Sequence, residues 1–389
     1  MGEAAVAFAR AVGYESAGTA EFMLAGGEFY FLELNARIQV EHPVTELVLG
    51  LDLVEWQLRV AELDEGYLML HVGPGTGHAI EVRLYAEDPA ADYQPQSGTL
   101  RTFEILAEDG IRVDGGFESG SEVSTHYDAM LAKVISTAPS REQAARQLAG
   151  VLERAKIHGL VTNRHLLVGI LRDPDFLDGD VSTAFLDGFE TGLRPSSATD
   201  GAATAAAIAL AEREVAARTV QRGIPVAFRN VPSQPQVTEF DGDVRVEWWG
   251  GRDGYVLSDA AVVSVSPTTV VLEADSVRTT YEVTVAGNDV DVDWPGGHLA
   301  LRRTPRFVDP ADAIASGSLL APMPGTVVSV NVEAGQQVAA GDVVLVLEAM
   351  KMQHRVSAPT AGTVTEINVQ PGTQVASGEV LAVVEGDTP

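Results

Sequence analysis

The sequence predicts a multidomain α+β protein, and three observations support that prediction. The chain has 389 residues, a length that corresponds to two or three ordinary domains. Helix-like and strand-like segments are mixed up to about residue 195, and an alanine-rich stretch followed by short strands occupies residues 196–307. A linker over residues 308–318 then leads into residues 319–389, which are rich in valine and glycine. We therefore expect three domains, over residues 1–195, 196–307 and 319–389.

The bulk composition excludes several classes of protein. The net charge is −29, whereas a protein that binds the phosphates of nucleic acid needs a basic surface. No apolar run is long enough to cross a membrane, and the acidic start of the chain is unlike a signal peptide. The sequence contains no cysteine, which excludes disulfides and thiolate metal sites. We expect a cytoplasmic protein that binds neither nucleic acid nor membrane.

The middle segment predicts a helix followed by strands. Residues 196–218 are rich in alanine and contain little glycine, which favours a helix. Beyond residue 225, hydrophobic and polar residues alternate between short turns that contain Asn-Asp, Asp-Gly and Gly-Gly, which is typical of strands. Trp248 and Trp249 lie in one of these strands, where we expect them to belong to a core rather than to an interface.

The last segment contains an internal repeat of two copies, APMPGTVVSVNVEAGQQVAAGDVVLVLE and APTAGTVTEINVQPGTQVASGEVLAVVE. Two copies of short valine-rich strands with matching glycine turns predict a small β-sandwich with pseudo-twofold symmetry. Between the copies, EAMKMQ predicts an exposed hairpin with Lys351 at its tip, flanked by Met350 and Met352. Lys351, one of three lysines in the chain, is either an ordinary surface residue or the attachment point of a prosthetic group.

The hairpin and the repeat resemble the biotinyl carrier domain of biotin-dependent carboxylases, as does the sequence APMPG at residues 321–325. The resemblance implies a flattened β-sandwich in which a biotin protein ligase attaches biotin covalently to Lys351. The lipoyl domain has the same architecture but usually carries Asp-Lys-Ala at the turn, so the two methionines favour biotin.

Residues 28–41, EFYFLELNARIQVE, alternate between apolar and polar side chains and predict an extended strand. The polar face of that strand would present Glu33, Asn35, Arg37, Gln39 and Glu41. A strand over residues 80–85 would likewise place Glu81, Arg83 and Tyr85 together. Such alternation also describes an ordinary solvated face. However, a row of carboxylates, an amide and an arginine suits the binding of a metal ion and an oxyanion.

These segments resemble the C-terminal part of a biotin carboxylase of the ATP-grasp superfamily. The matching motifs lie at residues 21–22, 33–46, 81–88 and 126–133. The resemblance implies that the Mg²⁺ or Mn²⁺ that accompanies ATP is bound by Glu21, Glu33 and Asn35. It also implies that bicarbonate is bound by Arg37, Gln39 and Val40, the last through its backbone.

The same resemblance implies a catalytic set of Arg37, Glu41 and Arg83. Glu41 would be the base that deprotonates bicarbonate, and Arg83 would stabilise the enolate of biotin. His42 precedes Pro43 and is therefore expected to shape a turn rather than to act as a base.

The middle segment resembles the connecting domain of acyl-CoA carboxylase α subunits, in which a helix leads into an antiparallel β-barrel. Together, the resemblances imply a subunit that uses ATP and bicarbonate to carboxylate biotin. A partner carboxyltransferase β subunit, in a hetero-oligomer, would then pass the carboxyl group to an acyl-CoA of the acetyl-, propionyl- or 3-methylcrotonyl-CoA type.

The sequence also allows a non-catalytic biotin or lipoyl carrier and docking protein. In the family that the sequence resembles, a glycine-rich phosphate loop and lysines that contact ATP precede the segment matched here. The first residues of this chain contain no such loop. We therefore expect a truncated form that lacks ATP-dependent activity of its own.

Overall fold

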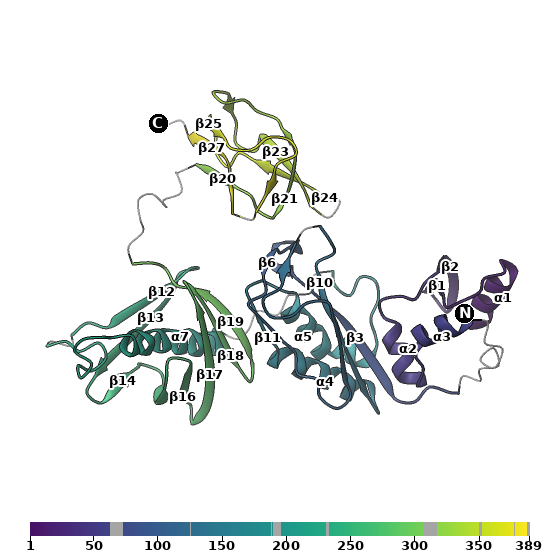
Figure 1. Cartoon of the computed structure of the whole chain (residues 1–389), viewed down its shortest axis with the longest axis horizontal. Helices are drawn as coiled ribbons and strands as arrows, with labels where there is room; N and C mark the ends of the chain where they lie inside the picture. Colours follow the sequence, from purple (N-terminus) through teal and green to yellow (C-terminus); the bar gives the residue numbers. More distant parts are fainter. Residues whose placement is uncertain are drawn as a thin grey trace.

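The computed structural model describes residues 1–62, 73–124, 126–187, 189, 196–230, 233–306, 317–349, 352–376 and 378–386. Figure 1 shows the elements in four groups, and the order of the groups in space follows the order of the chain except that the last group lies above the others in this view. No helix within these ranges is long and apolar enough to cross a membrane.

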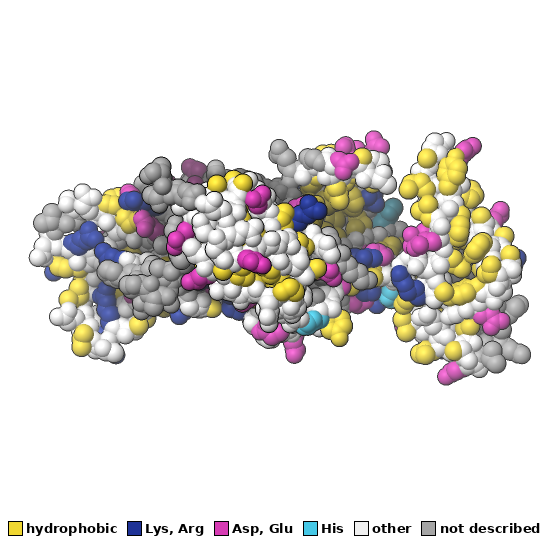
Figure 2. Space-filling view, turned by 90° about the horizontal axis from the view of Figure 1, so that it is seen from above, with side chains coloured by type: hydrophobic (Ala, Val, Ile, Leu, Met, Phe, Trp, Pro, Cys, Tyr) yellow, Lys and Arg dark blue, Asp and Glu magenta, His cyan; other side chains and the backbone are white. Residues whose placement is uncertain are grey.

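The first group, residues 1–62, has little core of its own. Its elements are α1 (Gly2–Ala11), an antiparallel hairpin of β1 (Thr19–Ala25) and β2 (Glu28–Asn35), α2 (His42–Leu49) and α3 (Leu53–Ala61). Within this range the buried side chains are those of Pro43 and Glu46. The rings of Phe8 and Phe31 are in contact in a tilted arrangement, with their centroids 4.8 Å apart, yet both side chains remain exposed. Figure 2 shows hydrophobic side chains on the surface at this end of the molecule.

The expected strand over residues 28–41 is wrong beyond Asn35. The ladder between β1 and β2 ends where Asn35 pairs with Thr19, because β1 begins at Thr19 and offers no further partner. The chain then bends over residues 36–41 and enters α2, whose first turn contains Pro43. Proline suits this position because it lacks an N–H and has a fixed helical φ.

The second group is built on a three-stranded antiparallel sheet with the order β3 (His78–Tyr85), β10 (Met130–Ala138) and β8 (Ile111–Gly115). The helices α4 (Arg141–Arg154) and α5 (Arg164–Arg172) pack with this sheet, and α6 (Pro174–Asp178) follows them. Ala144, Leu148 and Leu152 are buried at helical spacing on α4, which gives this group a hydrophobic core. The short strands around it are β4 (Glu87–Asp88), β5 (Gln94–Pro95), β6 (Gly98–Thr99), β7 (Thr102–Glu104), β9 (Glu122–Val123) and β11 (Lys156–His158).

The third group surrounds one helix with strands. The expected helix is α7 (Ser196–Ala216), and residues 202–203 and 205–211 on it are all buried. One sheet contains β12 (Gln236–Phe240), β13 (Val244–Gly251) and β14 (Gly254–Val256). The other contains β15 (Ala261–Val265), β16 (Thr269–Ala274), β17 (Val277–Ala286), β18 (Asp289–Trp294) and β19 (Gly297–Arg302). A bridge between Phe240 and Arg303 joins the two sheets, so the strands wrap around the helix as a barrel.

The barrel explains the composition of its helix. Seven of the buried residues at positions 202–211 are alanines, whose small side chains let strands approach on every side. At Gly201 a Cβ atom would lie 2.4 Å from the hydroxyl oxygen of Tyr281, so a larger residue would require the Tyr281 side chain to move. Trp248 is buried and donates from Nε1 to Thr238 at 3.1 Å, as expected for a core residue, whereas Trp249 is half-buried.

The fourth group is the expected β-sandwich. One sheet has the order β20 (Ser318–Leu320), β27 (Val380–Gly386), β25 (Gly362–Ile367) and β22 (Gln337–Val338). The other has the order β24 (Met352–Ser357), β23 (Val343–Ala349), β21 (Gly325–Val330) and β26 (Gln374–Val375). Their inner faces share one core of valine, leucine and alanine side chains.

The sequence repeat appears in the sandwich as repeated hydrogen bonds. Gly335 N donates to Val364 O at 2.7 Å, and the equivalent Gly372 N donates to Val327 O at 2.8 Å. Both glycines have φ near +90°, a conformation that side chains disfavour. Each copy therefore closes its turn on a strand of the other copy, which produces the pseudo-twofold symmetry.

Candidate functional site

The two candidate metal-binding carboxylates lie directly opposite each other on the β1–β2 hairpin. Glu21 pairs with Glu33 in the ladder, which places both side chains on the same face. Asn35 Nδ2 donates to Oε1 of Glu21 and to Oε1 of Glu33, at 2.9 Å in each case. Two carboxylates and an amide are oxygen ligands of the kind that Mg²⁺ binds, so these residues fit the ion.

The candidate bicarbonate-binding residues adjoin this cluster. Gln39 Nε2 donates to Glu21 Oε1 at 2.6 Å, and Arg37 Nη1 donates to Gln39 Oε1 at 2.8 Å. The bend after Asn35 replaces the expected strand, but it still brings Gln39 to Glu21 and Arg37 to Gln39. A guanidinium group and an amide next to a metal site suit a small planar anion.

The candidate base and the candidate biotin-site arginine form an ion pair. Arg83 Nε lies 2.6 Å from Glu41 Oε1, although the two residues belong to different groups of elements. Arg83 also reaches the hydroxyl group of Tyr85, at 3.5 Å, on the same face of β3. Burial alone would lower the pKa of Arg83, but Tyr85 and Glu41 raise it above its usual value. The site therefore holds a permanent cation next to a carboxylate.

Lys133 anchors the bend to the sheet, a role that the sequence did not suggest. Its Nζ donates to the carbonyl oxygen of Val40 at 3.0 Å and lies 3.1 Å from His42 Nε2. On β10 it also lies 3.3 Å from Asp114 on the neighbouring strand β8. Two features of the sequence could have singled out Lys133. Lysine occurs only three times in the chain, and Lys133 is the last residue of the motif at residues 126–133.

His42 and Glu46 connect α2 to the same sheet. His42 is the first residue of α2, and its Nδ1 lies 2.9 Å from Glu46 Oε1. Glu46 accepts from Leu53 N and from Arg112, both at 2.8 Å. Burial alone would raise the pKa of Glu46, but these bonds outweigh it and hold the pKa below its usual value.

Glu81 is a second residue whose role the sequence missed. It shares a face of β3 with Arg83, and both of its carboxylate oxygens are buried without a hydrogen-bond partner among the described residues. Burial raises the pKa of Glu81 to about 7; Lys133 opposes this shift, and Glu41 adds to it. The site thus contains a carboxyl group that is partly protonated near neutral pH.

This pKa predicts a pH-dependent stability. Between the ordinary value of 4.5 and about 7, native Glu81 holds a proton that the unfolded chain releases. The free energy of unfolding of the β3–β10–β8 sheet should therefore fall as pH rises through this window. Glu81→Gln should remove the fall, and Glu118→Gln, at an exposed position, should keep it. Pulse proteolysis in urea at pH 5 and pH 8 measures the free energy of unfolding of each variant. If that free energy falls equally in the parent and in Glu81→Gln, Glu81 is not the group that titrates.

The predicted hairpin tip between β23 and β24 lies outside the described residues, which leaves Lys351 and Met350 without a structural account. The side chain of Met352 is not described either. The flanking strands do form the expected hairpin. Ala349 on β23 pairs with Met352 on β24, so residues 350 and 351 connect the two strands.

Three family models match the chain. Residues 1–66 match the carbamoyl-phosphate synthase L chain, ATP binding domain, and residues 81–188 match the biotin carboxylase C-terminal domain. Residues 317–384 match the model described as biotin-requiring enzyme. These matches coincide with the first, second and fourth groups of elements.

Curated relatives align with 92% of the chain. The propionyl-CoA carboxylase alpha chain of Ruegeria pomeroyi is 34% identical over 413 residues, which is 59% of its own length. The mitochondrial methylcrotonoyl-CoA carboxylase subunit alpha of Mus musculus is 34% identical over 388 residues, or 54% of its length. The chain thus spans somewhat more than half of each relative.

Among solved structures, the biotin carboxylase domain of the Hydrogenobacter thermophilus 2-oxoglutarate carboxylase is 38% identical to the matched part of this chain. The match covers 49% of this chain and 43% of the solved chain, with a TM-score of 0.47.

Proposed function

Because the chain carries a biotin carboxylase C-terminal domain and a biotin-requiring domain, we propose that it serves as the alpha subunit of a biotin-dependent acyl-CoA carboxylase. In this role it uses ATP and bicarbonate to carboxylate biotin carried on Lys351. The observation that most supports the proposal is the convergence of Glu21, Glu33 and Asn35 with the Arg37–Gln39 pair.

In the proposed mechanism, Glu21, Glu33 and Asn35 hold a divalent ion. When bound, that ion neutralises the charge of the ATP phosphates. Gln39 donates to Glu21, which is one of the candidate metal ligands. An anion held by Gln39 and Arg37 would therefore lie beside the metal-binding residues. The two residues thereby orient bicarbonate towards the nucleotide, which lowers the barrier through positioning.

Glu41 is the residue that removes the proton from bicarbonate. Its ion pair with Arg83, at 2.6 Å, holds the carboxylate at β3 beside the arginine of the candidate biotin site. Arg83 then offers a fixed cation to the oxyanion that develops on the acceptor. Biotin, when attached, supplies the ring nitrogen that accepts the carboxyl group. Glu81 lies on the same face of β3 as Arg83.

Two protein partners follow from the proposal. A biotin protein ligase modifies Lys351 at the tip of the hairpin between β23 and β24. A carboxyltransferase subunit then receives the carboxyl group and transfers it to an acyl-CoA. The relatives named above are alpha chains of propionyl-CoA and methylcrotonoyl-CoA carboxylases, which supports an acyl-CoA as the final substrate.

The test uses a biotinylated form of the subunit that includes the glycine-rich phosphate loop, in its assembled enzyme, and measures ¹⁴C transfer from bicarbonate to protein as acid-labile label. Transfer should require ATP and Mg²⁺. Glu33→Gln should raise the Mg²⁺ concentration for half-maximal transfer by about 10-fold or more, since loss of an outer-shell partner alone costs 10–100-fold in metal affinity. Glu28→Gln, at the other end of β2, is the matched control and should behave like the parent.

Two results would count against the proposal. If Glu33→Gln and the parent need the same Mg²⁺ concentration, the hairpin is not the metal site. If the chain accepts biotin but its assembly never transfers label from bicarbonate, the function that remains is that of a biotin carrier and docking protein.

A further inference from the structure

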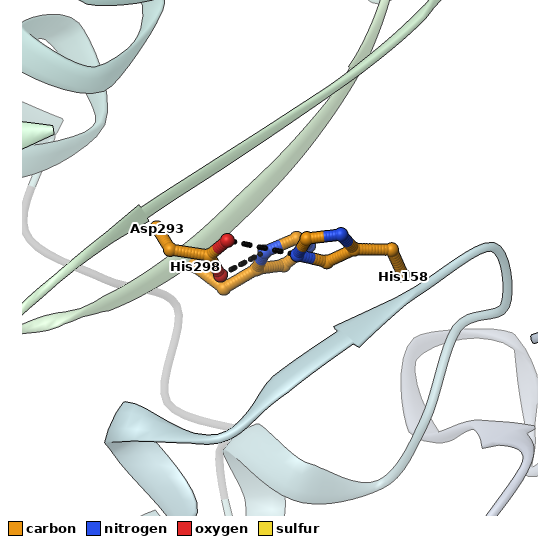
Figure 3. Close-up of side chains that lie close together, drawn as sticks. All are labelled: His158, Asp293 and His298. Atoms are coloured by element: carbon orange, nitrogen blue, oxygen red, sulfur yellow. Dashed lines mark hydrogen bonds and ion pairs between the residues drawn. The ribbon is translucent and has the colours of Figure 1, made fainter. Parts of the chain in front are cut away.

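A buried cluster of two histidines and an aspartate joins the second group of elements to the barrel. His158 extends from β11, whereas Asp293 and His298 belong to β18 and β19, as Figure 3 shows. His158 Nε2 lies 2.8 Å from Asp293 Oδ2, and His298 Nδ1 lies 2.9 Å from Asp293 Oδ1. The three side chains are far from the carboxylates of the β1–β2 hairpin in the chain and share no residue with them.

Both ring nitrogens of His298 face a carboxylate. Nδ1 of the ring faces Asp293, and Nε2 lies 3.5 Å from Oδ1 of Asp291. A neutral imidazole donates from one nitrogen only, so one of the two carboxylates faces a lone pair. A cation at Nδ1 would move the ring proton to Nε2, where Asp291 accepts it. Both carboxylates would then have a suitable partner.

The neighbouring residues hold this arrangement in place. Arg101 donates to Asp291 at 2.9 Å and to Asp289 at 3.1 Å, which orients Asp291 behind His298. A carboxylate behind a histidine is the usual outer-shell partner of a metal-binding imidazole. Lys156 and Glu282 form a further ion pair, at 2.7 Å, across the same junction. The junction is therefore built before any ion binds.

We propose that His158, Asp293 and His298 bind a divalent transition metal ion, for which Zn²⁺ is the probe. The donor atoms lie within 4.8 Å of one another, and two imidazoles with one carboxylate are a ligand set that Zn²⁺ favours and Mg²⁺ does not. Ligand atoms on a tetrahedral ion are roughly 3.3 Å apart. The two pairs at 2.8 and 2.9 Å would therefore open by about 0.5 Å, and the widest separation, at most 4.8 Å, would close by up to about 1.5 Å. A cavity of about 770 Å³ is lined by His298 and Asp291 and would give solvent access to the fourth position on the ion.

The ion would lock two parts of the chain together, because its ligands come from β11 on one side and from β18 and β19 on the other. This role is structural and independent of the proposed carboxylase chemistry. A bound ion stabilises the folded form in proportion to the logarithm of its concentration above Kd.

The test measures Zn²⁺ binding to the full chain, stripped of metal, in competition with a chromophoric chelator. The parent should bind about one equivalent, and Zn²⁺ but not Mg²⁺ should raise its melting temperature. His298→Gln should weaken Zn²⁺ binding by about 10–100-fold or more. The matched control is His78→Gln, at an exposed residue on β3, which should bind like the parent.

A second measurement covers the case in which a variant fails to fold. Co²⁺ added to the parent should give the visible absorption of a tetrahedral site with nitrogen and oxygen ligands, and Zn²⁺ should displace it. The proposal is overturned if the parent binds neither ion, or if folded His298→Gln binds Zn²⁺ as tightly as the parent. Because neither measurement uses ATP, bicarbonate or biotin, its failure would leave the proposed carboxylase function untouched.

Discussion

Replacing Lys351 by arginine is expected to abolish biotin attachment and, with it, all transfer of carboxyl groups by the chain. Arginine keeps the positive charge, but its delocalised guanidinium group is not the amine that a ligase acylates. The chain offers only two other lysines. Lys133 donates to the Val40 carbonyl, and Lys156 pairs with Glu282, so both amines are engaged. The residual label in Lys351→Arg should therefore be near zero.

The measurement is co-expression with a biotin ligase followed by an avidin gel shift and mass spectrometry. Lys156→Arg serves as the matched control and should carry biotin to the same extent as the parent. Equal labelling of Lys351→Arg and the parent would refute the assignment. A mass increase that corresponds to lipoate in place of biotin would identify the alternative carrier family.

In a form of the subunit that includes the glycine-rich phosphate loop, Glu41→Gln is expected to slow bicarbonate-dependent ATP cleavage by about 100-fold or more, the range of general-base catalysis. Glutamine keeps the shape of the side chain and an oxygen that can face Arg83, 2.6 Å away in the parent. It cannot take a proton, so the chemical step fails while the binding of nucleotide stays close to that of the parent. The variant should thus lose turnover but keep its affinity for the nucleotide.

The control for this variant is Glu28→Gln on the same hairpin, which should retain full turnover. A Glu41→Gln enzyme with undiminished bicarbonate-dependent turnover would mean that residues 33–41 form an ordinary solvated surface. Lost turnover together with lost nucleotide binding would instead indicate a positioning role for the carboxylate of Glu41 and would reject its role as the base.

Local patterns in the sequence predicted those elements in which neighbouring residues decide the structure. The valine-rich repeat predicted the sandwich, because equivalent glycines such as Gly335 and Gly372 close equivalent turns. The alanine-rich stretch predicted α7 over nearly its full length. Alternation along residues 80–85 placed Glu81 and Arg83 on one face of β3.

Such local patterns do not predict contacts between segments that are distant in the chain. The bend after Asn35 depends on where the partner strand β1 begins, which alternation in β2 does not reveal. Lys133 is 93 residues from the Val40 carbonyl that it binds, and His158 is 135 residues from Asp293. The burial of the Glu81 carboxylate oxygens is likewise not visible in the alternation along β3.

The helix enclosed by the barrel has a consequence for the order of folding. Strands β12–β19 surround α7, so they cannot complete their ladder and then admit the helix afterwards. α7 precedes all of these strands in the chain, and its 21 residues exceed the roughly 12–15 that an alanine-rich helix needs to form alone in water. During synthesis the helix therefore emerges first, as a template around which the slower, long-range strand pairing proceeds.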